Sequence, residues 1–306
     1  MKIIDILRQH QANPLGKPCI SFEYYPPKSR ERWPEFYEKI ARMGSLGPRF
    51  IDVTWGTGDP TSLDTIEIAR NIQERTGIDA MMHLTCTHRT REELLDIMAH
   101  VVEETPMRNV MALRGNRPKL GDWTPHPGGF GNACELVRAL RGRFGDALSI
   151  AVAGYPEGHR EDGHAPDASF VHSAEYAAQM RYMREKVDAG ADFIVTQLCF
   201  DLARLCRYRD DCARVGISCP IVPGILPVHG RQTWERIAAF SASIPAELAA
   251  RYEKAAHGGD EAIEAFAVEL LGEQIAYLRH EGFCAVHLYT LNHERVISRA
   301  LQRGIR

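Results

Sequence analysis

The feature that most constrains the fold of this chain is a regular alternation between short apolar runs and longer segments of helical periodicity. Eight runs have the length and the β-prone composition of buried strands: residues 18–25, 50–55, 80–86, 110–115, 148–155, 193–200, 220–228 and 285–292. Amphipathic segments separate or follow them: residues 33–43, 62–76, 91–104, 133–144, 174–189, 202–215, 231–242, 246–256, 261–280 and 294–304. Because strands that alternate with helices favour parallel pairing, the pattern predicts a parallel sheet covered by helices.

Eight strand–helix units in 306 residues predict that this sheet closes on itself. A closed (β/α)8 barrel typically takes about 250 residues. The rival is an open doubly wound sheet, but no GxGxxG motif follows the first run. No linker or low-complexity segment divides the chain. We therefore expect an α/β fold in which residues 1–306 form a single (β/α)8 TIM barrel with extra helices near the C-terminus.

Composition narrows the range of partners. The net charge of -3 gives no indication of a nucleic acid or a membrane surface, and no apolar run is long enough to span a bilayer. Residues 1–16 carry mixed charges and lack the apolar core of a signal peptide. The eight cysteines include no CxxC pair, which argues against a disulfide framework or a zinc site. We expect a cytoplasmic protein, with a homo-oligomer left open.

Polar residues gather where the apolar runs end. These residues are Glu23, Thr54, His83, Thr85, Arg114, Asn116, Tyr155, His159, Gln197, Tyr289 and Asn292. In a (β/α)8 barrel the carboxyl ends of the strands form the rim on which active sites are built. Any one of them, such as His83, is more simply explained as a hydrogen-bonded core residue. The joint pattern predicts a site on the rim.

Glu23 is the carboxylate that the first run delivers to that rim. Two aromatic residues and two prolines follow it, and the prolines end the strand because they fix φ and lack backbone donors. Burial beside aromatic surface can raise the pKa of a carboxyl group, so that it serves as a proton donor near neutral pH. The alternative is a structural ion pair with Lys28 or Arg30.

Two loops carry weaker signals. Glycines at 128, 129 and 131 precede a helical segment, where backbone N–H groups could approach a phosphate or simply form a turn. The stretch 156–172 contains three histidines among acidic residues. Their spacing matches no standard metal motif, so we predict a solvated or lid loop and no metal.

Eight motifs, in order, resemble the methylenetetrahydrofolate reductase family over nearly the whole chain. They are Ser-Phe-Glu-Tyr-Tyr-Pro-Pro-Lys at 21–28, Asp-Val-Thr-Trp-Gly at 52–56, His-Leu-Thr-Cys at 83–86, Ala-Leu-Arg-Gly at 112–115, Ala-Gly-Tyr-Pro-Glu-Gly-His at 153–159, Ala-Gly-Ala-Asp-Phe-Ile-Val-Thr-Gln-Leu at 189–198, Pro-Ile-Val-Pro-Gly-Ile-Leu-Pro at 220–227 and His-Leu-Tyr-Thr-Leu-Asn at 287–292. The resemblance implies a barrel that carries FAD on its rim. It also implies that NAD(P)H reduces the flavin, which then reduces 5,10-methylenetetrahydrofolate to 5-methyltetrahydrofolate.

The resemblance also assigns expected roles to residues. Glu23 matches the acid that opens the folate ring, and the amide of Gln197 matches the partner of the pterin. Asn116 completes the expected catalytic set. The positions that match contacts to flavin or its phosphates are Thr54, His83, Arg114, Gly115, Asn132, Tyr155, His159, Gln179 and Lys186. The expected substrate contacts are Glu23, Asn116, Gln197, Arg231 and Tyr289.

Several of these positions depart from the family pattern. Asn116 stands where an aspartate is usual, Asn132 where a tyrosine is expected, and Gln179 where an acid would hold a ribose. Arg231 and His293 replace an aromatic residue and an arginine. These changes predict weakened FAD binding. Two alternatives therefore stay open: direct hydride transfer from NAD(P)H to folate, and a folate-binding barrel without turnover. No lysine lies inside a strand core, which argues against a Schiff-base aldolase.

Overall fold

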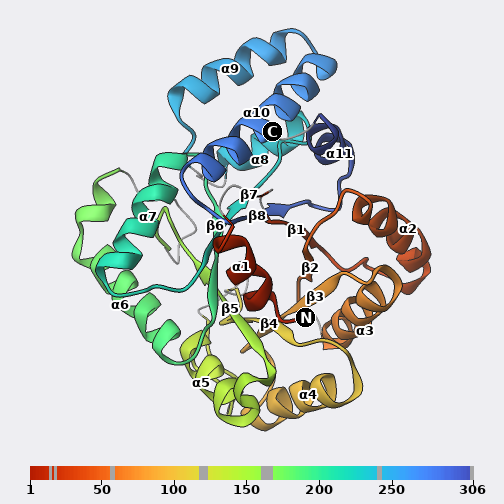
Figure 1. Cartoon of the computed structure of the whole chain (residues 1–306), viewed down its shortest axis with the longest axis vertical. Coiled ribbons are helices and arrows are strands. Elements are labelled where there is room, and N and C mark those ends of the chain that lie inside the picture. Colours follow the sequence, from red (N-terminus) through yellow and green to blue (C-terminus); the bar gives the residue numbers. More distant parts are fainter. Residues whose placement is uncertain are drawn as a thin grey trace.

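The computed structural model describes residues 1–13, 16, 19–55, 59–116, 123–159, 168–239 and 243–303. Eight parallel strands close into a barrel in the order of the chain (Figure 1). The strands are β1 (Cys19–Tyr24), β2 (Phe50–Val53), β3 (Asp79–Thr85), β4 (Asn109–Leu113), β5 (Ser149–Gly154), β6 (Phe193–Leu198), β7 (Ile221–Ile225) and β8 (Ala285–Tyr289). Each overlaps one of the eight predicted runs. The predicted (β/α)8 barrel is therefore confirmed.

Helices form the outer layer of the barrel (Figure 1). The helices that follow the strands are α2 (Trp33–Gly44), α3 (Asp59–Thr76), α4 (Arg91–Glu104), α5 (Ala133–Phe144), α6 (Ala174–Asp188), α7 (Leu202–Arg214), α8 (Arg231–Ala239) and α11 (Arg295–Gln302). Short 3-10 turns lie at Arg30–Arg32, Gly145–Ala147 and Ala168–His172. Helices α9 (Ala246–His257) and α10 (Asp260–His280) lie between α8 and β8, as the expectation of extra helices near the C-terminus required. Within the described residues, no helix combines the length and the apolar character needed to cross a membrane.

Alternation along the strands decides which side chains reach the barrel interior. Phe22 and Ile51 pack in the large cluster beneath the outer helices, whereas Cys19, Phe50 and Met81 belong to a second cluster inside the barrel. Successive side chains on a strand point to opposite faces. On each strand, the residue two positions after a member of this second cluster therefore also faces the barrel interior, nearer the carboxyl end of the strand. Ser21, Asp52 and His83 are such residues.

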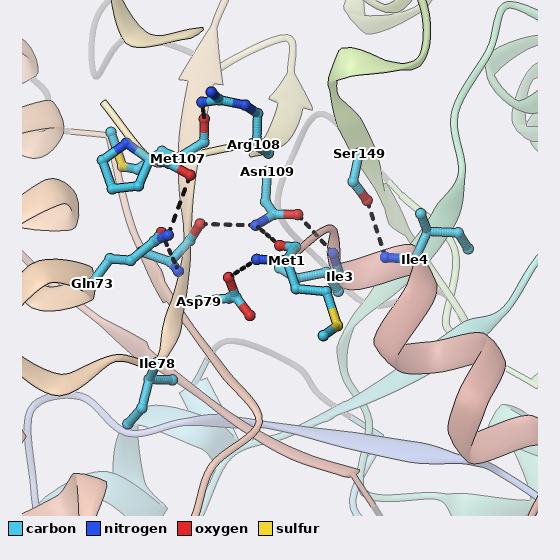
Figure 2. Close-up of polar contacts among 12 residues, drawn as sticks. Met1, Ile3, Ile4, Gln73, Ile78, Asp79, Met107, Arg108, Asn109 and Ser149 are labelled. Carbon is cyan, nitrogen blue, oxygen red and sulfur yellow. Dashed lines mark hydrogen bonds and ion pairs between the residues drawn. The ribbon is translucent and has the colours of Figure 1, made fainter. Parts of the chain in front are cut away.

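Helix α1 (Ile3–Gln11) closes the amino-terminal end of the barrel (Figure 1). Its buried isoleucines and Leu7 complete the inner apolar cluster. Lys2 provides no side-chain cap, so the strands supply one: Asn109 Oδ1 accepts from the Ile3 amide at 2.7 Å, and Ser149 Oγ accepts from the Ile4 amide at 3.2 Å (Figure 2). From the sequence, residues 1–16 are expected only to carry mixed charges and to lack the apolar core of a signal peptide; helix α1 and its position were not predicted. Helix α1 thus acts as a plug at the amino-terminal end. Inward side chains can therefore contact a ligand at the carboxyl end of the barrel.

Candidate active site

Glu23 lies inside the barrel near the carboxyl end of β1, with 5% of the residue exposed. Parallel register sets it beside Asp52 on β2 and Tyr289 on β8. The turn after β8 holds the backbone at Glu23 and at Tyr25, two residues later. The Thr290 hydroxyl donates to the Glu23 carbonyl at 2.5 Å, and the Asn292 side chain makes two hydrogen bonds of 2.9 Å with the Tyr25 backbone. Glu23 is thus held by elements from opposite ends of the sequence.

The nearest polar neighbours of the Glu23 carboxyl group are His83 and Asp52. The Nε2 atom of His83 lies 2.9 Å from Asp52 Oδ2 and 3.7 Å from Glu23 Oε2. Burial, followed by the negative charge of Asp52, raises the pKa of Glu23 well above its usual range. Arg30, one of the two cations considered as a partner of Glu23, pairs instead with Asp64 and Glu67. Glu23 therefore has the environment of a proton donor.

A second histidine lies deeper in the same cluster. His287 on β8 is fully buried; its Nδ1 lies 2.8 Å from Ser21 Oγ and its Nε2 lies 3.5 Å from Asp52 Oδ1. Burial lowers the pKa of His287, which keeps the ring neutral. The sequence analysis did not select Ser21, Asp52 or His287. The alternation of side chains along each strand could have identified them, because each is a polar residue at a position that faces the barrel interior in an otherwise apolar strand.

This cluster also contains the donor types that a metal ion prefers. Among the described residues, oxygen atoms of Glu23 and Asp52 and a ring nitrogen of His287 lie within 4.8 Å of one another. These groups already contact protein atoms, since His83 Nε2 lies 2.9 Å from Asp52 Oδ2 and Ser21 Oγ lies 2.8 Å from His287 Nδ1; we therefore assign the cluster to proton chemistry rather than to a metal ion. The histidine-rich loop lies elsewhere: His159 and His172 are described, whereas His164 lies outside the described residues.

Two of the predicted folate contacts, Gln197 and Tyr289, lie at the carboxyl ends of β6 and β8. Gln197 is exposed at the end of β6, next to a register shift between Val195 and Leu198. The Tyr289 hydroxyl donates to the Thr196 carbonyl at 2.6 Å, which joins β8 to β6. Gly224 on β7 makes this possible, because a Cβ atom there would lie 2.5 Å from the Tyr289 ring.

Arg231 lies apart from this rim group. It is exposed at the start of α8, and its guanidinium donates to the Ala256 carbonyl of α9 at 3.3 Å. The structure therefore places Arg231 against α9, and its predicted contact with substrate stays a prediction.

Three predicted cofactor contacts have polar groups that are engaged within the protein. Gln179 makes two hydrogen bonds, of 2.9 and 2.6 Å, to the backbone of His159. Lys186 is 4% exposed, donates to the Ala153 carbonyl at 2.7 Å, and has its pKa lowered by burial to about 8. Asn132 caps α5 by accepting from the Glu135 amide at 3.0 Å. A flavin dinucleotide at these three positions would have to share side chains that already make bonds within the protein.

The other predicted cofactor residues lie on rim segments. The rings of Tyr155 and His159 pack edge to face with centroids 4.5 Å apart. The Arg114 guanidinium lies over the Trp123 ring at 5.2 Å. Gly115 has a φ of +95°, and a Cβ atom there would come within 2.5 Å of the Thr87 side chain, so only glycine fits.

The remaining predicted residues differ in exposure. Thr54 is half-buried just after β2, where its amide donates to the Tyr24 carbonyl at 3.0 Å. Asn116 is exposed, and residues 117–122 beyond it lie outside the described part of the chain. Thr54 and His83 thus border the Glu23 cluster, while Gln179 and Lys186 belong to the packing of α6 against the barrel.

Comparison with known proteins adds independent information. The family model described as methylenetetrahydrofolate reductase matches residues 7–304. A protein of Oryza sativa subsp. japonica named probable methylenetetrahydrofolate reductase (NADH) is 38% identical over 302 residues, covering 96% of this chain and 49% of the relative. Methylenetetrahydrofolate reductase (NADH) 1 of Arabidopsis thaliana is also 38% identical, over 294 residues, covering 95% of this chain and 49% of the relative. The chain thus spans about half the length of these curated relatives.

A solved structure shares the fold. It is an uncharacterized protein from Clostridium thermocellum that binds two copies of 5-methyl-5,6,7,8-tetrahydrofolic acid, with a TM-score of 0.64 and 14% sequence identity. The match covers 97% of this chain and 96% of that protein. At this identity the likeness concerns the barrel fold alone.

Proposed function

Because the chain belongs to the methylenetetrahydrofolate reductase family, we propose that it reduces 5,10-methylenetetrahydrofolate to 5-methyltetrahydrofolate with NADH or NADPH as the electron donor. The observation that carries the proposal is Glu23, a buried acid on the strand end where ligands of such barrels bind. Its raised pKa suits it to give a proton at neutral pH.

The reaction needs one proton and one hydride. In 5,10-methylenetetrahydrofolate a methylene carbon joins two nitrogen atoms, N5 and N10. Protonation of N10 lets the bond between N10 and the methylene carbon break, and the lone pair of N5 then forms an iminium with that carbon. A hydride added to the iminium carbon gives the methyl group. Glu23 supplies the proton and is left as a carboxylate, which takes a replacement proton from solvent. Burial of Glu23 keeps its proton from being lost to water before the folate arrives.

Substrate recognition falls to the rim of β6 and β8. The amide of Gln197 offers a donor and an acceptor, which is what one edge of a pterin requires. Tyr289 lies beside Glu23 in the sheet register and encloses the carboxyl group from β8. We assign the pterin to the space above these two residues, with Asn116 on the opposite loop as a further expected contact.

The route of the hydride is the second part of the proposal. A bound FAD would accept the hydride from the nucleotide and pass it on, and Thr54, His83, Arg114 and Gly115 would border it. However, the polar groups of Gln179, Lys186 and Asn132 are bonded within the protein. This observation favours direct transfer from NAD(P)H to the folate. We therefore assign the hydride transfer directly from the nicotinamide to the folate. Retention of Glu23 argues against a barrel that only binds folate.

An absorption spectrum and initial rates separate these routes. Direct transfer requires both substrates to bind together, so colourless protein should reduce 5,10-methylenetetrahydrofolate without added FAD and give intersecting double-reciprocal plots. A flavin relay requires the substrates to take turns, so it predicts a stoichiometric yellow chromophore and parallel plots. Protein that reduces no folate with either nucleotide, with or without FAD, would overturn the reductase proposal.

A further inference from the structure

Asp52, the carboxylate beside Glu23 in the sheet register, has no assigned role. We propose that Asp52, held between His83 and His287, is the positioning residue that controls the proton on Glu23. This inference rests on the proposed function, because it concerns the acid of that reaction. It goes beyond that function by assigning a task to three residues at the centre of the barrel.

The sheet register places the charge of Asp52 directly beside Glu23. Asp52 has no exposed surface, and its neighbour in register on β1 is Glu23. Each of its oxygens faces a different histidine, His83 at 2.9 Å and His287 at 3.5 Å. The carboxylate is therefore fixed from two strands, β3 and β8. A group held this way can act on a neighbour without moving.

His287 supports Asp52 through a defined ring orientation. Asp52 Oδ1 and His287 Nε2 are buried, and neither has a short hydrogen-bond partner among the described residues. A neutral ring carries one proton. If the hydroxyl of Ser21 donates to Nδ1, the ring proton lies on Nε2, which is 3.5 Å from Asp52 Oδ1; this is a close electrostatic contact rather than a hydrogen bond. Ser21 thus orients the ring, and the ring orients the carboxylate.

The consequence for Glu23 is electrostatic. Two carboxylates at this depth cannot both carry a charge cheaply, since little water screens them. The other titratable groups that face Glu23 are His83 on β3, His287 and Tyr289 on β8, and Tyr25 just after β1. Burial raises the pKa of Tyr25 to about 12 and also raises the pKa of Tyr289 well above its usual range, so both phenols are neutral at the working pH. Asp52 therefore supplies the negative charge that favours the protonated form of Glu23.

The test replaces Asp52 with an uncharged residue of the same shape. Infrared spectroscopy of the free protein follows the C=O stretch of the protonated Glu23 carboxyl group, identified by its loss in Glu23→Gln. In Asp52→Asn this band should disappear at a pH at least about one unit lower than in the parent protein. The limb of the kcat/KM profile that falls with rising pH should move the same way. At a fixed pH above both midpoints, that is about a tenfold loss of activity.

Asp192→Asn is the matched control. Asp192 is a half-buried carboxylate that pairs with Arg141 at 2.7 Å and accepts from the Ile150 amide, away from the candidate site. Its removal should lower the melting temperature and leave both titrations unchanged. If Asp52→Asn does not fold, Asp52→Ser removes the same charge with less bulk.

The two proposals fail in different ways. An unchanged Glu23 band in Asp52→Asn would overturn the inference even in a working reductase. A parent protein without reductase activity would overturn the proposed function. The infrared titration of the free protein would still decide whether Asp52 controls the proton on Glu23.

Discussion

Glu23 owes its chemistry to side chains on neighbouring strands rather than to residues near it in the sequence. Burial, followed by the charge of Asp52, raises the pKa of Glu23, and His83 lies close to both carboxyl groups. The flanking turn residues Thr290 and Asn292 hold its backbone. The aromatic and proline residues after Glu23 mark the strand end. The environment of its carboxyl group, in contrast, depends on the sheet register that sets Asp52 beside it.

Glu23→Gln tests the acid. The amide keeps the shape of the side chain and cannot donate an acidic proton, so folate reduction should fall by roughly 10²–10⁴-fold. Folding should be retained, because the change removes a carboxyl group that faces Asp52. Steady-state rates and circular dichroism measure the two effects. Activity within a few-fold of the parent would remove Glu23 from the mechanism.

Gln197→Ala tests folate recognition. Loss of the amide leaves one pterin edge without its hydrogen-bond partners, so the KM for folate should rise far more than the KM for NAD(P)H. Gln197 is exposed, so the melting temperature should change little. Equal increases in both KM values would indicate that Gln197 has only a general packing role on the rim.

For the helices and strands, the sequence predicted the type of each element better than its tertiary contacts. The eight strands and most of the helices follow from periodicity, which is a local property. Helix α1 was not predicted as a plug, because its partners Asn109 and Ser149 lie more than 100 positions away. Gln179 and Lys186 match cofactor positions, and both also make internal hydrogen bonds, to the His159 backbone and to the Ala153 carbonyl; their contact with a cofactor stays a prediction. Where a helical side chain is directed depends on packing, which the sequence alone does not show.

Asn109→Ala tests the plug. Asn109 accepts from the Ile3 amide and donates to the carbonyls of Met1 and Ala80 (Figure 2). Its loss should lower the free energy of unfolding by about 1–3 kcal/mol, because a buried amide is left without a partner. Urea denaturation measures this change, and kcat should stay as in the parent. Asn71→Ala, which removes a half-buried hydrogen bond to Tyr37, is the control and should cost less.

Lys186→Met tests the buried cation of α6. Burial lowers the pKa of Lys186 to about 8 in the folded protein, against about 10.4 in the unfolded chain. Between these values the unfolded chain binds the extra proton, so the free energy of unfolding should gain up to about 1.4 kcal/mol per pH unit from Lys186 as pH rises. The difference between the parent and Lys186→Met should show this slope. Parallel stability curves from pH 8 to 10 would contradict it.

On the scale of the whole molecule, the barrel has a polarity gradient along its axis. The amino-terminal end is closed by α1, the middle is apolar, and the inward side chains become polar toward the carboxyl end. The sequence already indicated this rim, because the polar residues fell at the ends of the predicted strands. It did not reveal the cluster of Asp52, His83 and His287, since that cluster depends on which strands adjoin in the closed sheet.

The most direct test of the account is isotope transfer from the nucleotide to the folate. The protein would be incubated with 5,10-methylenetetrahydrofolate and either NADH or NADPH carrying deuterium at the hydride position, without added FAD. Mass spectrometry of the folate should then find 5-methyltetrahydrofolate with deuterium in its methyl group, and Glu23→Gln should yield almost none. Folate that stays unreduced with both nucleotides, whether or not FAD is supplied, would contradict the account.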